Sequence, residues 1–154
     1  MLAFSIEAPD VKVFMNKLLK EQTFDAFQVK SVEIKSIATF EIDASIHKDY
    51  LPEDSPDRKF CKWNEIRPYV FNIIKGTQKP RAIKIVFSYD PSLTLEPHPN
   101  AAALFLNIYF ENNKINCTTA TSQINFSLNK DVDAYWNDFI KVFFKDNSIV
   151  ISTH

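Results

Sequence analysis

The basic residues of this 154-residue chain are concentrated near its middle. Between Arg58 and Lys84 the sequence has eight basic residues and one acidic residue, Glu65, whereas the remainder has ten basic and eighteen acidic residues. All three arginines lie in this span, and arginine is the side chain best suited to bidentate contact with an anion. The span therefore predicts an anion-facing surface on an otherwise acidic body.

Five side chains of the basic span are candidate anion-binding residues. They are Lys62, Arg67, Lys75, Lys79 and Arg81. Trp63 and Tyr69 offer stacking surfaces beside them, so a nucleic acid or another phosphorylated ligand is expected, with binding that weakens steeply as salt rises. The alternative is a solvated, lysine-rich helix face and loop. The helix dipole alone explains Lys75 near a helix C-terminus, and burial in the core explains Trp63.

Two other polar groups carry weaker signals. Glu41 and Asp43 are two residues apart on a predicted strand and share a face. Paired carboxylates suit acid–base chemistry or a hard cation, but exposed strand positions look the same. The polar run from Asn116 to Gln123 suits a recognition face, or equally the solvent side of a strand, where threonine is favoured.

Motifs for catalysis or cofactor binding are missing from the sequence. Gly76 is the only glycine, which excludes a Walker A loop, a dinucleotide-binding loop and a nucleophile elbow, because each needs several glycines. His47, His98 and His154 are scattered and lack the spacing of a zinc site. We therefore expect no catalytic residue, no metal and no cofactor, and the sequence favours a binding role over an enzyme.

Length and composition predict one globular domain over residues 1–154, with 45% apolar and 24% charged residues. No secretory signal is visible at the start, and no apolar stretch approaches the roughly 18 residues of a membrane helix, so no membrane partner is expected. Cys61 and Cys117 are too few for a disulfide framework. They indicate free thiols and a cytoplasmic protein.

The spacing of apolar residues predicts three helices. An apolar helical face spans residues 10–20, a second helix runs from Asn64 to about Lys75, and a third spans residues 131–147. Gly76 directly follows the second helix and is expected in the left-handed conformation that often ends helices.

Alternation of apolar and polar residues predicts strands in the rest of the chain. The predicted strands lie near residues 2–6, 27–34, 40–46, 81–89, 104–110, 115–117, 124–128 and 148–152. Asn112 and Asn113 tolerate the positive φ of a tight hairpin turn. The resulting order is β-α-β-β-α-β-β-β-β-α-β, which predicts an α+β fold: an antiparallel-rich sheet with about three helices packed on one face.

Three stretches of the sequence together resemble a known family. They are WNEIRPYVFNIIKGTQKP, ALFLNIYFENNKINCTTATS and the opening FSI followed by DVKVFMNKLL. They are similar to an uncharacterised bacterial family of short, single-domain proteins, catalogued as a domain of unknown function. The matching positions are Trp63, Glu65, Arg67, Pro68, Lys75, Gly76, Pro80, Thr118, Thr119 and Trp136. The resemblance implies a stand-alone cytosolic protein without an assigned activity, and it transfers no catalytic residue.

The sequence leaves three functional hypotheses. The first is a small binding module whose basic surface takes a phosphate-containing or polyanionic ligand. The alternative is a protein–protein interaction or homo-oligomerisation domain without catalysis, which would use edge strands or spare aromatic residues such as Phe105 and Tyr109. A hydrolase or transferase is the third hypothesis, and no motif supports it.

Overall fold

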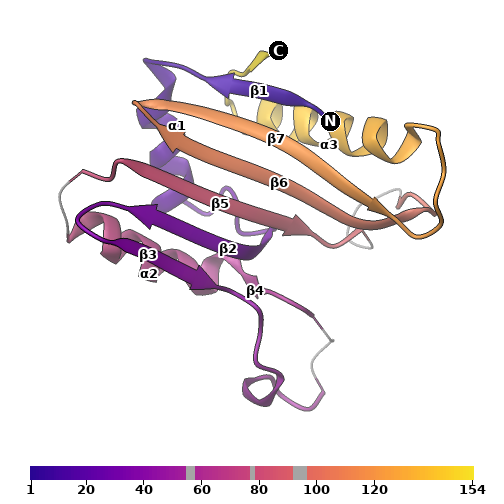
Figure 1. Cartoon of the computed structure of the whole chain (residues 1–154), viewed down its shortest axis with the longest axis horizontal. Coiled ribbons are helices and arrows are strands. Elements are labelled where there is room, and N and C mark those ends of the chain that lie inside the picture. Colours follow the sequence, from indigo (N-terminus) through magenta and orange to yellow (C-terminus); the bar gives the residue numbers. More distant parts are fainter. Residues whose placement is uncertain (55–57, 77–78, 92–96) are drawn as a thin grey trace.

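The computed structural model describes residues 1–54, 58–76, 79–91 and 97–154. Within these ranges, eight strands form one antiparallel sheet and three α-helices pack on one of its faces (Figure 1). The strands are β1 (Ala3–Ile6), β2 (Gln28–Lys35), β3 (Thr39–Asp43), β4 (Cys61–Lys62), β5 (Ala82–Tyr89), β6 (Ala101–Glu111), β7 (Lys114–Gln123) and β8 (Ser152–Thr153). The helices are α1 (Asp10–Leu19), α2 (Trp63–Lys75) and α3 (Asp131–Asp146), with a short 3-10 helix at Lys48–Tyr50.

The strands follow the order β3-β2-β5-β6-β7-β1-β8, and the short β4 pairs with β2. The first and last strands of the chain therefore meet at one edge of the sheet. Figure 1 shows α3 behind β7, and α2 behind β2 and β3. The described helices thus leave the opposite face of the sheet uncovered, and we call it the open face.

Apolar side chains of the strands face the helices and form the core. Phenylalanines dominate its centre, where Phe24 stacks on Phe87 with ring centroids 5.5 Å apart. Both tryptophans are fully buried, and each indole N–H finds a backbone carbonyl: Trp63 donates to Leu18 at 2.9 Å and Trp136 to Phe105 at 2.8 Å. A buried indole needs such a partner. Each helix in the described ranges is too short or too polar to traverse a bilayer.

The predicted α+β class and antiparallel-rich sheet are confirmed, and the elements follow the predicted order apart from two short segments described below. The predicted hairpin turn is confirmed as well, because Asn112 and Asn113 have φ angles of 54° and 57° between β6 and β7. The expected left-handed Gly76 is wrong, since its φ is −81°. Its N–H donates to the carbonyl of Asn72, and a Cβ at this position would lie 3.1 Å from the same oxygen. Close backbone approach, rather than a positive φ, therefore favours glycine here.

One predicted strand is absent from the described sheet. Ile124, Phe126 and Leu128 alternate with polar residues, yet they lie outside any strand and are 61%, 85% and 85% exposed. The pairing of β7 with β6 ends at Gln123, and none of the described strands pairs with the chain beyond it. The side chain of Asn100 instead bonds the backbone of the following segment. Conversely, Cys61–Lys62 lie outside the predicted strands, yet they form β4 and pair with β2.

Candidate functional site on the open face

Alternation along the central strands decides which side chains reach the open face. Val32, Ile85 and Leu106 are buried on the helix side, so their neighbours in sequence project from the other side. These neighbours and their alternates are Ser31, Glu33, Lys84, Val86, Phe105, Asn107 and Tyr109. The open face therefore has charged side chains on β2 and β5 and aromatic side chains on β6.

The register aligns charged side chains in a row across this face. Glu41 on β3 is directly opposite Glu33 on β2, and Glu33 is directly opposite Lys84 on β5. Lys84 in turn is opposite Tyr109 on β6. Directly opposed residues have Cβ atoms that lie close together. The row across the sheet therefore consists of two adjacent glutamates, then a lysine, then an aromatic ring.

A bulge in β2 adds a second lysine. β2 pairs with β5 at Val29 and again at Ser31, with the register shifted between them, so Lys30 is the extra residue. Bulges redirect side chains in this way. The Lys30 ammonium lies 5.5 Å from the ring centroid of Phe105 on β6, which is within cation–π distance. Lys30 therefore reaches across β5.

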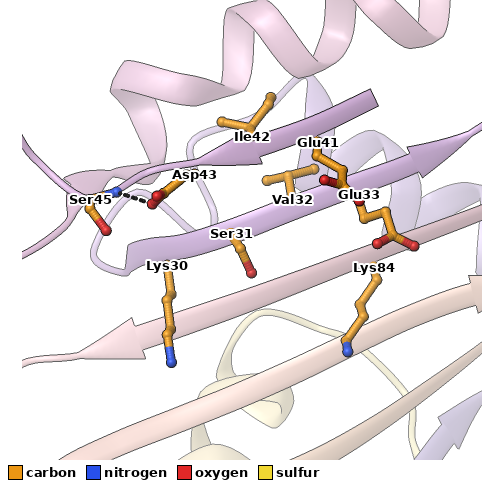
Figure 2. Close-up of a pocket in the computed structure, with 9 residues that line it drawn as sticks. All are labelled: Lys30, Ser31, Val32, Glu33, Glu41, Ile42, Asp43, Ser45 and Lys84. Atoms are coloured by element: carbon orange, nitrogen blue, oxygen red, sulfur yellow. Dashed lines mark hydrogen bonds between the residues drawn. The ribbon is translucent and has the colours of Figure 1, made fainter. Parts of the chain in front are cut away.

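The two lysines border an open hollow of about 450 Å³ between β3, β2 and β5 (Figure 2). Figure 2 shows Lys30 and Lys84 extending in the same direction, away from Asp43 and Glu41. Within the described part of the chain, neither lysine makes an ion pair, whereas the neighbouring Lys35 contacts Glu33 at 3.6 Å. Lys30 and Lys84 are therefore exposed cations available to a ligand.

The carboxylates of the hollow lie on its β2–β3 side. Asp43 accepts a hydrogen bond of 3.0 Å from the backbone N–H of Ser45, which lowers the pKa of Asp43. Glu33 and Glu41 lie opposite each other. Among the described residues, however, no three carboxylate, imidazole or thiol groups are close enough to hold a metal ion.

A second hollow of about 280 Å³ adjoins Phe105, at the end of β5 and the beginning of β6. Lys59 and Arg58 line it from the segment before β4. Arg58 is engaged by Glu65 through two hydrogen bonds of 2.6 and 2.9 Å, and this pairing raises the pKa of Arg58 and lowers that of Glu65. Lys59 is exposed and makes no ion pair with a described residue.

Arg67, a predicted anion-binding residue, already has partners within the protein. Its guanidinium donates to the backbone carbonyl of Glu21 and to a carboxylate oxygen of Asp25, both at 2.5 Å. These contacts join α2 to the segment that follows α1. The predicted stacking residue Trp63 is fully buried, while Tyr69 is exposed.

The other predicted anion-binding residues are spread along α2 and beyond it. Lys62 and Lys75 flank opposite ends of the helix, which at 1.5 Å per residue places them roughly 20 Å apart. Lys75 lies 6.0 Å from the ring of Phe71. Lys79 is exposed, and the backbone of Arg81 bonds the carbonyl of Lys35 near the β2–β3 hairpin. The five residues do not form one compact cluster, and their role remains a prediction.

A family model agrees with the resemblance noted in the sequence. Residues 17–152 match a model described as "Family of unknown function (DUF5721)". The chain belongs to this family. No curated protein and no solved structure matches it. The function of this family is unknown, so the open face itself supplies the basis for a functional proposal.

The open-face lysine of β2 in this DUF5721 protein was missed by sequence reasoning, although a signal exists. Apolar residues in β2 are spaced by three between Val29 and Val32, where a regular strand would space them by two. That irregularity marks the bulge at Lys30. Lys84 lies within the basic span, but its position beside an aromatic row depends on the pairing of β5 with β6.

The predicted polar run on β7 divides between the two faces. Thr119 is buried, and its hydroxyl accepts a bond from the Leu2 N–H at 2.8 Å and bonds Asn137 of α3 at 2.6 Å. Thr118, on the open face, accepts a bond of 3.3 Å from the side-chain amide of Asn107. Part of the run is therefore structural, and part extends the open face.

Proposed function

We propose that this protein is a binding module that holds a phosphate-containing ligand on the open face of its sheet. The observation that carries the proposal is the pair of exposed lysines, Lys30 and Lys84, which share a hollowed face without carboxylate partners among the described residues. Ammonium groups placed in this way bind phosphate by charge and by hydrogen bonds.

We also propose a cytoplasmic location, in keeping with the free thiols of Cys61 and Cys117.

A titration with tripolyphosphate and with a ten-residue single-stranded oligonucleotide, both at about 50 mM salt where phosphate contacts are strong, tests this function. We expect the Lys30→Glu/Lys84→Glu variant to bind both probes at least tenfold more weakly than the parent protein. The matched control is Lys12→Glu/Lys141→Glu, which makes the same charge change on exposed positions of α1 and α3. Unchanged binding by the first variant, or no binding by the parent protein, would reject the proposal.

The basic surface predicted from the sequence is a second location for the same function. Lys75→Glu/Lys79→Glu alters two of its exposed positions, one at the end of α2 and one in the segment after it, and leaves Lys30 and Lys84 unchanged. A loss of binding in this variant alone would move the ligand from the open face to the surroundings of α2.

Self-association is the second candidate function, and one observation favours it. Ile124, Phe126 and Leu128 are largely exposed, and Ile124 and Phe126 line an open hollow of about 570 Å³ near the start of α3. Exposed apolar side chains that lie together in this way often mark an interface. Light scattering should then show a dimer that Phe126→Asn/Leu128→Asn converts to a monomer. A monomeric parent protein at high concentration would contradict self-association.

A further inference from the structure

The open face carries two lysine–aromatic pairs, and the aromatic ring of each pair lies on β6. In the first pair, the Lys30 ammonium lies over the ring of Phe105. In the second pair, Lys84 is directly opposite Tyr109 in the register of β5 and β6. A cation beside an exposed ring combines a phosphate contact with a stacking surface, which are the two contacts that a nucleotide unit requires. The two pairs therefore offer the same combination twice.

The distance between the two rings sets the minimum length of a ligand that stacks on both. Phe105 and Tyr109 are four residues apart on one face of β6, which at about 3.4 Å per residue separates them by roughly 14 Å. One base cannot stack on both rings, so their joint use needs at least two nucleotides. Between the rings lies Asn107, whose amide already bonds the hydroxyl of Thr118. This amide gives the interval a polar surface that suits base edges or sugar hydroxyls.

The charges on the open face define the path that a ligand would follow. A row of lysines leads from the first hollow to the second, alongside the aromatic residues of β6: Lys84, Lys30 and Lys59. Glu33, Glu41 and Asp43 border the first hollow on the side of β2 and β3 and repel phosphate there. A phosphate backbone on this face would therefore follow the lysines alongside β6.

We propose that the ligand on the open face is single-stranded nucleic acid, with separate bases stacked on Phe105 and Tyr109 and with its phosphates on Lys30, Lys84 and Lys59. This inference rests on the function proposed above and specifies its ligand. Unpaired bases are required because a duplex hides the base faces that stack on aromatic rings. Lys30 moves from the Phe105 ring to a phosphate when a base takes its place.

Both aromatic rings are suited to this role in the free protein. Tyr109 is 38% exposed, and its hydroxyl donates a 2.5 Å hydrogen bond to Glu111. That bond raises the pKa of Tyr109, whose ordinary value of about 10 already keeps the phenol uncharged at physiological pH. Phe105 is partly exposed and lines the second hollow.

The test measures fluorescence anisotropy of a labelled ten-residue oligothymidylate or oligouridylate with ring-deleting variants. Phe105→Leu and Tyr109→Leu keep apolar bulk but remove the stacking surface. Each should weaken binding by about five- to hundredfold, the usual effect of losing one stacked base. Tyr109→Phe, which keeps the ring, should stay within about twofold of the parent protein. Tyr69→Leu removes an exposed ring on α2 and should have no effect.

Three further readouts separate this inference from the function on which it rests. Tripolyphosphate has no base, so its binding should be lost with Lys30→Glu/Lys84→Glu but unchanged by Tyr109→Leu. A duplex of the same length should bind at least tenfold more weakly than the single strand. Neutralising three phosphates should give a slope of about −2 for log affinity against log salt.

The outcomes are distinct. If Tyr109→Leu and Phe105→Leu bind the oligonucleotide as the parent does, or if the duplex binds equally well, the single-strand inference is overturned while phosphate binding stands. If the lysine variant retains the binding of tripolyphosphate and oligonucleotide, both proposals fail. Because Phe105 is partly buried, its result counts only when thermal unfolding shows an intact fold; Tyr109 has no such restriction.

Discussion

The guanidinium of Arg67 on α2 donates a 2.5 Å hydrogen bond to the carboxylate of Asp25, which lies 42 residues earlier in the chain. The Arg67 side chain is 18% exposed and the Asp25 side chain 22%, so the pair is largely shielded from water. The same guanidinium also satisfies the backbone carbonyl of Glu21. An arginine that the sequence places in an anion-binding surface therefore holds α2 against the segment after α1.

Replacing Arg67 by alanine should destabilise the fold without weakening ligand binding. The substitution leaves the Asp25 carboxylate and the Glu21 carbonyl without their partner, and losing a hydrogen bond to a charged group costs about 1.5–3 kcal/mol. Urea unfolding should show this loss, with Lys12→Ala as a neutral surface control. A protein of unchanged stability that no longer binds tripolyphosphate would show that Arg67 contacts the ligand instead.

The stability that Glu65 contributes should depend on pH. Hydrogen bonds from Arg58 are the main cause of the lowered pKa of Glu65. A carboxylate with a lowered pKa in the folded state stabilises the protein above its unfolded pKa, which is about 4.5, and loses this contribution as pH falls through the folded value. The Tm difference between the parent protein and Glu65→Gln should therefore be largest near neutral pH and shrink below about pH 4. A difference that is constant from pH 7 to pH 3 would contradict this linkage.

Removing one charge from the Glu33–Glu41 pair should stabilise the protein. Like charges directly opposite on adjacent strands are unfavourable, and cross-strand pairs contribute roughly 0.2–1 kcal/mol. We expect Glu41→Gln to raise the free energy of unfolding, measured by urea denaturation, by a similar amount. Glu53→Gln, at an exposed loop position, controls for the change in net charge. A decrease in stability would indicate that the two carboxylates have favourable partners in solution.

The indole N–H of Trp63 should contribute measurably to folding. Trp63→Phe removes the donor that satisfies the carbonyl of Leu18 and leaves a gap in a fully buried site. An unsatisfied buried acceptor costs about 1–3 kcal/mol, and the gap adds to this loss. Chemical unfolding of Trp63→Phe and of Tyr69→Phe, an exposed aromatic control, provides the comparison. Equal stability of the two variants would argue against this contribution.

Residue patterns predict some features of the candidate site but not the contacts between its strands. Asp43 and Glu41 could be assigned to one strand face because side chains alternate along a strand, and Asn112–Asn113 could be assigned to a turn because asparagine tolerates a positive φ. The contact of Lys30 with Phe105 could not be assigned in this way. It depends on a bulge and on two strands pairing across β5, and neither is determined by local preference.

The amino-acid sequence by itself determined the α+β class, the three amphipathic helices, most of the strands and the concentration of basic residues near the middle of the chain. These features depend on local periodicity and on the chemistry of single residues, and both are visible in the sequence itself. Only the tertiary structure decided that Asp25 engages Arg67 and that Glu65 engages Arg58. It also decided that Lys30 and Lys84 reach one uncovered face beside Phe105 and Tyr109. Strand order and helix packing bring together residues that are distant in the chain, and no local pattern encodes those distances.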